Sequence, residues 1–172
     1  MSIIDRGGLR LEDYLTTIYR LEEALGEARI TDIAHELSVT PATASKIIGK
    51  LEKKGFVKRI RYRNVRLTQP GREIAERIIR KHRIAEVFLS KLLRFSDLDS
   101  HHYAHFLEHL PDIVIERIYE YIGRPVLCPH GNLIPGSVVE GMVELYSMLN
   151  VDLGVSYTLI RVAGEFTKVL EF

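Results

Sequence analysis

The segment that most restricts how this chain can fold runs from His101 to His109 and reads HHYAHFLEH. Residues three and four positions apart share one face of an α-helix, with Cβ atoms about 5–6 Å apart. A helical segment would therefore align His101, His105, Glu108 and His109 in one stripe. Imidazoles and a carboxylate in this arrangement can reach one divalent metal ion. A solvated histidine-rich face is the alternative, but five of the seven histidines lie between His82 and His109, which favours ligands.

The ligand types indicate which metals to expect. Imidazole suits the later first-row metals and carboxylate suits harder ions, so the mixture indicates iron, manganese, zinc or cobalt. His82 and Glu86 are four residues apart in a predicted helix and form a second potential ligand pair, although for these two alone we favour a solvated hydrogen-bonded pair. Cys128 and His130 lack a second Cys/His pair, and the sequence Cys-Pro-His-Gly predicts a turn.

A concentrated block of positive charge predicts a polyanionic partner. From Ser38 to Arg72 there are ten Lys and Arg residues and a single acid, Glu52, whereas residues 73–172 carry ten Lys and Arg and fourteen Asp and Glu. The formal net charge of +1 conceals this asymmetry. A solvated lysine-rich face usually interleaves glutamates, and this block does not. Nucleic acid is therefore the expected partner.

Three helices are predicted before and within the basic block: two precede it and the third lies inside it. Apolar residues at the helical period predict an amphipathic helix over Leu9–Leu25. Ile30–Leu37, capped by Thr31, and residues 40–55 predict two helices joined by a short turn, which defines a helix-turn-helix. The second helix begins with small, polar and basic side chains that can meet base edges and phosphates. The predicted DNA-contacting residues are Thr31, Thr40, Ala42, Thr43, Ser45, Lys46, Lys50, Lys53 and, in the segment that follows, Arg63.

A β-hairpin is predicted directly after the helix-turn-helix. The β-rich runs Phe56–Arg61 and Asn64–Thr68 flank a short turn, and a hairpin at this position is typical of a winged helix. Arginines at its tip would lie along the phosphate backbone. A Pro-Gly pair then opens a long helix over Arg72–Leu93, whose length suits a link to a second domain.

The remaining segments predict a helical domain and a short β-containing end. The predicted histidine helix covers Asp97–Leu110, and another helix follows from Pro111 to Gly123. The apolar face of this last helix contains Ile113, Val114, Ile118, Tyr121 and Ile122. This face predicts a dimer seam, unless it packs on the long helix of its own chain. Residues 124–136 predict an ordered loop, and a short helix from Val138 and strands over 155–163 and 166–172 are expected after it.

The expected fold class is mostly α. A winged-helix DNA-binding domain (1–71) precedes a helical metal-binding and dimerisation domain (72–136) and a short β-containing segment (137–172). The composition is globular, at 46% hydrophobic and 27% charged residues, and no apolar run is long enough to span a membrane. The single cysteine cannot form an internal disulfide, which fits a cytoplasmic location.

Several of these motifs resemble the diphtheria toxin repressor and manganese transport regulator family of metal-dependent repressors. EDYLTTIYRLEE resembles the family's first helix, and LTQPGREIAERIIRKHRIAEVFL resembles its wing-to-linker segment. LEH at 107–109 and RPVLCPHGNLIPG resemble its ligand helix and proline loop. The similarity covers about residues 12–136 in the family's order. It implies that the C-terminal segment corresponds to part of an SH3-like third domain.

The resemblance also implies a set of metal ligands. The matching positions are Asp13, His105, Glu108 and His109 for one site and His82, Glu86 and His101 for a second, ancillary site. His105 replaces the Cys or Glu of other members, which leaves the metal open. Thr16 stands where manganese-type members carry a second carboxylate.

The resemblance implies a homodimeric repressor of metal-homeostasis genes, activated by Fe2+ or Mn2+, on a palindromic operator in double-stranded DNA. Zn2+, Co2+ or Ni2+ are expected to substitute in vitro. No enzymatic activity, small-molecule substrate or membrane partner is expected. One alternative is a metal-independent winged-helix regulator whose histidines are structural or sense pH. The other, a metal-dependent hydrolase, would need an open coordination position and a general base.

Overall fold

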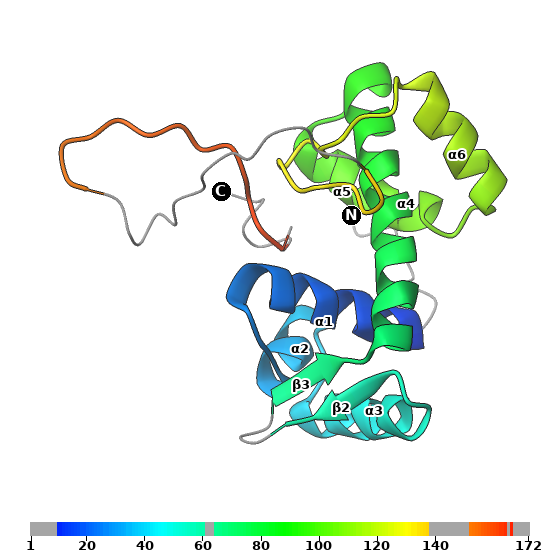
Figure 1. The fold of residues 1–172 in the computed structure, drawn as a ribbon, viewed down its shortest axis with the longest axis vertical. Helices are drawn as coiled ribbons and strands as arrows, with labels where there is room; N and C mark the ends of the chain where they lie inside the picture. The colour runs from blue at the N-terminus through cyan, green and yellow to red at the C-terminus, as the bar shows by residue number, and fades with distance from the viewer. Residues whose placement is uncertain (1–9, 61–63, 138–151, 165, 167–172) are drawn as a thin grey trace, which may run out of the picture.

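The computed structural model describes residues 10–60, 64–137, 152–164 and 166. The elements are α1 (Leu11–Leu25), β1 (Ala28–Arg29), α2 (Ile30–Glu36), α3 (Pro41–Lys53), β2 (Val57–Arg59), β3 (Asn64–Leu67), α4 (Gln69–Leu93), α5 (Asp97–Leu107) and α6 (Asp112–Tyr121). Figure 1 shows a head made of α1–α3 and the strands, and a second unit in which α5 and α6 lie beside α4. The long helix α4 belongs to both.

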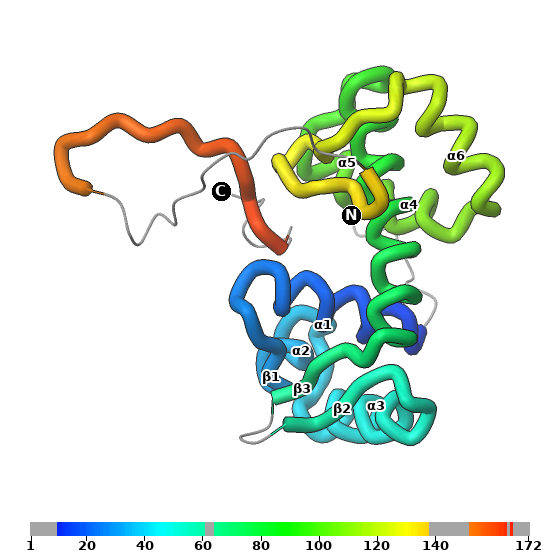
Figure 2. The backbone as a smooth tube through the Cα atoms, viewed as in Figure 1, coloured from blue at the N-terminus to red at the C-terminus, as the bar shows by residue number. Residues whose placement is uncertain are grey.

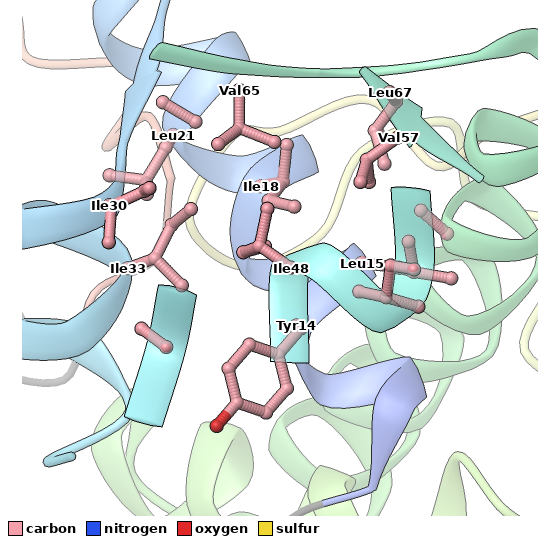
Figure 3. Close-up of a cluster of buried hydrophobic side chains, with 14 of the residues drawn as sticks. Tyr14, Leu15, Ile18, Leu21, Ile30, Ile33, Ile48, Val57, Val65 and Leu67 are labelled. Carbon is pink, nitrogen blue, oxygen red and sulfur yellow. The ribbon is translucent and has the colours of Figure 1, made fainter. Parts of the chain in front are cut away.

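The head is built around one apolar core. Leu15, Ile18 and Leu21 recur at helical spacing on α1 and are at most 2% exposed. They meet the buried Ile48 of α3 and Val65 of β3 in the cluster of Figure 3. Complete burial of each such side chain stabilises the fold by about 1.5–3 kcal/mol. The amphipathic pattern of the sequence therefore correctly predicted which faces pack together.

A three-stranded antiparallel sheet with the order β1-β3-β2 confirms the predicted winged helix. Val57 of β2 pairs with Leu67 of β3, and Val65 pairs with Ala28. The strand β1 was not predicted, because it has only two residues and becomes a strand only by pairing with β3. The predicted DNA contact Arg63 lies outside the described residues.

Most helix ends follow their predicted signals. Thr40 caps α3 as expected from the following proline, since the backbone N–H of Thr43 donates to Thr40 Oγ1 (3.1 Å). The predicted cap of α2 at Thr31 is wrong. Arg29, in the extended conformation, occupies the N-cap position because its residue pairs with β3 just before the helix begins.

The helix α4 starts at Gln69, three residues earlier than predicted, with Thr68 as its N-cap. Gly71 is required there, because a Cβ atom at this position would lie 1.9 Å from the carbonyl oxygen of Phe56. This close contact fixes the first turn of α4 against the sheet. Within the described ranges, neither α4 nor any other helix is long and apolar enough to cross a membrane.

The second unit packs α5 and α6 on the far half of α4. Ile84 and Val87 of α4 are buried with Ile115 of α6 and Ile134 of the loop. The histidine helix α5 ends at Leu107, before the predicted Leu110, so Glu108 is its C-cap. The predicted continuous stripe on one helix is therefore corrected, since its last two members lie at and beyond the helix end.

The apolar face of α6 is divided between two environments. Ile118 and Ile122 pack partly against the core of their own chain, as the alternative interpretation expected. Ile113 and Tyr121 are 66% and 78% exposed. Tyr103 and Phe106 of α5 are also exposed, at 43% and 51%. A dimer seam at α6 stays a prediction, and these exposed side chains are its candidates.

A buried ion pair joins the head to α4. Arg83 is fully buried, and its guanidinium donates to Glu23 of α1 (2.5 Å) and to the carbonyl oxygen of Leu133 (2.6 Å). Arg161 of the C-terminal segment also contacts Glu23 (3.0 Å). Removing one member of a buried pair usually costs about 3–5 kcal/mol, because the remaining charge stays buried.

The predicted strand over 155–163 is wrong: these residues have no assigned strand. The path of residues 152–164 is drawn in orange and red in Figure 2. Besides the contact of Arg161 with Glu23, this segment contacts the loop, where Val162 N donates to His130 O (2.8 Å) and Asn132 Nδ2 donates to Val162 O (2.7 Å). An alternating sequence forms a strand only where a partner edge is available. The predicted helix from Val138 lies outside the described residues, as does nearly all of 166–172.

Candidate metal centre

Two helices and one loop bring potential metal ligands together in the second unit. His82 and Glu86 of α4 are fully buried, so the interpretation as a solvated pair is wrong. The helix α5 covers this face of α4 and removes the pair from water. His101 of α5, which is 2% exposed, faces both residues.

His82 lies between two carboxylates. Its Nδ1 contacts Glu108 Oε2 at 2.7 Å, and its Nε2 contacts Glu86 Oε1 at 3.0 Å. His101 Nδ1 donates to the same Glu86 oxygen (2.8 Å). One nitrogen from each of His82, His101 and His105 lies within 4.8 Å of the others. The group combines His82 and His101 of the predicted ancillary site with His105 of the other predicted site, and its residues come from two helices.

A second group contains two residues that sequence reasoning rejected. Glu86, Cys128 and His130 are all buried, and one ligand atom of each lies within 4.8 Å of the others. Cys128 and His130 come from the proline loop, which the hydrogen bond from Cys128 N to Asn132 O (2.9 Å) holds in place. No spacing along the chain reveals their nearness to Glu86, forty-two residues before Cys128. Only their residue types could have indicated a site, because a thiol and an imidazole two residues apart are common zinc and iron ligands.

Glu86 has an oxygen that the described residues leave without a hydrogen bond. Its Oε1 is shared by His82, His101 and His130, whereas its buried Oε2 has no partner in the described part of the chain. An unsatisfied buried carboxylate oxygen is costly. A divalent cation would satisfy it. The imidazoles, carboxylates and thiol around it therefore fit a first-row transition metal.

The remaining predicted ligands gather at the end of α5. His105 Nδ1 and His109 Nε2 lie 3.5 and 3.7 Å from Glu108. Asp13 of the head lies close enough to interact with the charges of this group. Burial raises the pKa of its carboxyl, the hydrogen bond from the Arg10 backbone N–H (2.6 Å) opposes the rise, Glu108 adds to it and His109 opposes it. A nearby cation would stabilise the charged form of this carboxyl. The structure thus brings residues of the head and of the second unit to one place.

The protonation of His82 determines the charge balance of the cluster. Burial disfavours the charged form of His82, but Glu86 and Glu108 outweigh this effect and raise its pKa to about 9. Burial lowers the pKa of His101 to about 3, and the charged His82 adds to that effect. The contacts with histidines outweigh burial and hold the pKa of Glu86 well below its usual range. At neutral pH a protonated His82 thus supplies the positive charge between two carboxylates.

The recognition face of the head is open to solvent. The helix α3 buries Ala44, Ile48 and Leu51. Of the predicted DNA contacts, the exposed ones are Thr31, Thr40, Ala42, Thr43, Lys46, Lys50 and Lys53, and Ser45 is half-buried. All but Thr31 lie on α3 or at its N-cap, so the structure brings most of the predicted set to one helix.

A winged-helix head joined through one helix to a buried cluster of imidazoles, carboxylates and a thiol defines a metal-responsive DNA-binding protein. Residues 8–65 match the family model of the iron dependent repressor, N-terminal DNA binding domain. Residues 68–136 match that of the iron dependent repressor, metal binding and dimerisation domain. The chain belongs to the iron-dependent repressor family, of the diphtheria toxin repressor and MntR type, a family of transcriptional regulators rather than enzymes.

Curated relatives carry the name HTH-type transcriptional regulator MntR. The one from Geobacillus thermodenitrificans is 36% identical over 99 residues, which cover 58% of this chain and 70% of that protein. The one from Listeria welshimeri is 38% identical over 112 residues, or 63% of this chain and 76% of that protein. The resemblance inferred from the motifs is therefore confirmed.

Solved structures agree on the fold. The manganese regulator SloR has a TM-score of 0.73 at 33% identity, covering 95% of this chain and 78% of SloR. A manganese-dependent transcriptional repressor in complex with manganese has a TM-score of 0.77 at 30% identity, covering 94% and 76%. IdeR from T. acidophilum has a TM-score of 0.69 at 33% identity and covers 78% of this chain, which spans only 64% of IdeR.

Proposed function

We propose that this chain is a homodimeric cytoplasmic repressor that Fe2+ or Mn2+ activates to bind a palindromic operator of metal-homeostasis genes. The observation that carries the proposal is the buried Glu86 carboxylate, whose Oε2 has no partner among the described residues while three histidines surround Oε1. A cluster of this kind has no use in an ordinary apolar core. The exposed α3 of the same chain supplies the DNA-reading surface.

Two ligand sets are proposed. Glu86, Cys128, His130 and His101 would hold one ion, with His82 between this set and the next. Asp13, His105, Glu108 and His109 would hold the other. The solved relatives include a manganese-bound repressor and a zinc-bound ScaR. Imidazole suits Fe2+ and carboxylate suits Mn2+, and Zn2+, Co2+ or Ni2+ would also bind in vitro.

The position of Asp13 supports a mechanism in which the head is held at one angle. Asp13 belongs to α1 of the head, whereas Glu108 and His109 follow α5. When bound at this site, the metal supplies a positive charge that Asp13 of the head and Glu108 of the second unit share. Asp13 and Glu108 would then attract a common centre instead of repelling each other. Restricting the head to the DNA-binding orientation removes the population penalty of the other orientations.

The dimer would place two copies of α3 on the same side of the DNA. Helix-turn-helix dimers read half-sites one helical turn, about 34–36 Å, or a multiple of it apart. The seam would use the exposed apolar side chains of α5 and α6, including Phe106, Ile113 and Tyr121. The angle of each head then determines whether the two copies of α3 match the half-site spacing.

Operator binding at fixed salt, titrated with Fe2+, Mn2+, Zn2+ and chelator, tests the proposal. The operator would first be selected from random-sequence DNA in the presence of each metal. We expect sequence-specific binding that appears with metal and disappears with chelator. Binding that ignores chelator would instead support a metal-independent regulator, and metal-dependent hydrolysis without operator binding would support an enzyme.

Replacing Asp13 by Ala should separate metal binding from activation. The other ligands remain, so we expect calorimetry to show metal binding to the variant, while metal no longer strengthens operator binding. His109→Ala should weaken metal binding at this site directly. In both variants the nonspecific DNA affinity, which depends on the basic block, should persist.

Glu12→Ala is the matched control, because Glu12 is the exposed acid next to Asp13 on α1. It should respond to metal like the unchanged protein. If Asp13→Ala is still fully activated by metal, the head is not held through Asp13, and another contact must transmit the signal.

A further inference from the structure

We propose that Arg59 and Glu52 form a tether between the wing and the recognition helix α3, and that Arg59 is a positioning residue for DNA recognition rather than a phosphate contact. The inference rests on the proposed DNA-binding function and assigns a role that residue type alone would not suggest. Arg59 is one of ten Lys and Arg residues in the block 38–72, and charge alone would place all ten on the phosphate backbone.

The contacts of Arg59 all point to α3. Its guanidinium Nη2 donates to the carbonyl oxygen of Ser45 (2.7 Å) and to Ser45 Oγ (3.3 Å). Its backbone N–H donates to Glu52 Oε1 (3.0 Å), and its Nε lies 3.5 Å from Glu52 Oε2. One arginine at the end of β2 thus spans two turns of the recognition helix, from Ser45 to Glu52.

The surface of α3 has room for this arrangement. Gly49 lies between the two anchor residues, and a Cβ atom at this position would already lie 3.5 Å from Arg59 Nη2. Alanine would therefore just fit, but any longer side chain would displace the guanidinium. Glycine in a helix interior costs about 0.5–1 kcal/mol relative to alanine. The open surface along the Arg59 side chain is a reason for a glycine in the middle of α3.

The same contacts explain the single acid of the basic block. Glu52 is the only Asp or Glu between Ser38 and Arg72. Against a DNA phosphate a carboxylate is unfavourable, so its presence on the recognition helix needs another reason. The Glu52 carboxylate contacts both the backbone N–H and the side chain of Arg59. The guanidinium of Arg59 contacts Ser45 and Glu52, so part of its charge is compensated within the head.

The tether lies at the end of β2, the first strand of the β2–β3 hairpin that forms the wing. Arg59 is the last residue of β2, and the next residue, Ile60, donates its N–H to Asn64 O (2.8 Å) to close the hairpin. Holding Arg59 therefore fixes the end of β2 against α3. Specific binding requires α3 and the wing to fit the groove and the backbone together, whereas nonspecific binding does not. Loss of the tether should consequently reduce specificity.

The two classes of contact differ in their salt dependence. Losing one phosphate contact lowers the slope of log Kobs against log salt concentration by about 0.9 and weakens binding to every sequence. For the charge-neutral double variant Arg59→Met with Glu52→Ala we expect about tenfold weaker binding to the operator, with unchanged nonspecific affinity and unchanged slope. Arg66→Met is the matched control: Arg66 is an exposed arginine of the neighbouring strand β3, and its loss should lower the slope.

Glu52→Ala gives a test with the opposite sign. Removing a negative charge from the recognition helix should strengthen DNA binding if only charge matters. The tether predicts weaker operator binding instead, and no further loss when Glu52→Ala and Arg59→Met are combined. Arg59→Lys keeps the charge but cannot reach both anchors, so it should not restore specificity. Tighter operator binding by Glu52→Ala, or rescue by Arg59→Lys, would overturn the proposal.

A measurement without DNA separates failure of the tether from failure of the proposed function. The backbone N–H of Arg59 donates to Glu52, so its hydrogen exchange should be faster in Glu52→Ala than in the unchanged protein. Equal exchange rates would show that the contact is absent in solution, whatever the protein binds. If exchange changes as expected but neither protein binds DNA with any metal, the tether exists and the DNA-binding function is wrong.

Discussion

Glu86→Gln is expected to weaken metal binding by about 100-fold or more and to abolish the metal response of operator binding. Even residues that only support a metal ligand usually change affinity by about 10–100-fold when they are replaced. Glu86 belongs to the group with Cys128 and His130, and its Oε1 also lies within hydrogen-bonding distance of His82 and His101 of the neighbouring histidine group. The amide keeps the size of the side chain but loses the negative charge that a cation requires.

Calorimetric titration with Mn2+ and with Fe2+ under anaerobic conditions would measure this loss. Glu73→Gln makes the same chemical change on an exposed residue of the same helix, where the carboxylate accepts a hydrogen bond from the Gln69 side chain (3.0 Å). It should bind metal normally. Unchanged affinity in Glu86→Gln would show that the buried cluster is structural and that metal binds elsewhere.

The metal-free protein is expected to be most stable near pH 6.5 and to lose stability in both directions. The pKa of His82 is raised from 6.5 to about 9, so its contribution is complete below pH 6.5 and is lost as the pH rises through 9. The pKa of His101 is lowered to about 3, so its contribution is complete above pH 6.5 and is lost as the pH falls. Burial also lowers the pKa of His105, to about 4, so two histidines contribute on the acid side. Each proton corresponds to about 1.4 kcal/mol of unfolding free energy per pH unit, with one proton on the alkaline side and two on the acid side.

Urea unfolding of chelator-treated protein between pH 4 and pH 9.5 would trace this profile. His101→Gln should make the acid side less steep, and the same change at His102, which lies on the same helix outside the cluster, is the matched control. Glu86 and Glu108 also have lowered pKa values, so they add to the loss of stability below about pH 4.5. A flat profile above pH 6.5 would show that His82 is not protonated in the folded metal-free protein.

Local signals were sufficient to predict most of the head. Thr40 and Pro41 predicted the start of α3, and the apolar spacing of α1 predicted its buried face. The strand β1 escaped prediction because two residues carry no periodicity, and the false cap at Thr31 followed from not knowing that Arg29 pairs with β3. Errors of this kind arise where pairing between distant segments decides local structure.

The metal centre depended more heavily on contacts that spacing cannot show. The stripe from His101 to His109 identified the right region, but it assumed one helix where α5 ends at Leu107. Whether His82 and Glu86 lie in water or in a core depends on α5 covering them. The contribution of the proline loop was missed because Cys128 and His130 meet Glu86 only in three dimensions.

Because α4 is one continuous helix, the number of residues in it sets how the metal ligands are rotated relative to the head. The helix runs without interruption from the base of the wing to the metal ligands His82 and Glu86. Each inserted residue turns everything beyond it by about 100° and moves it by about 1.5 Å. A single insertion between Ala75 and Arg80 would therefore turn Glu108 and His109 away from Asp13 while the head and the second unit kept their own cores. Homologues and engineered variants can change side chains along this stretch far more freely than they can change its length.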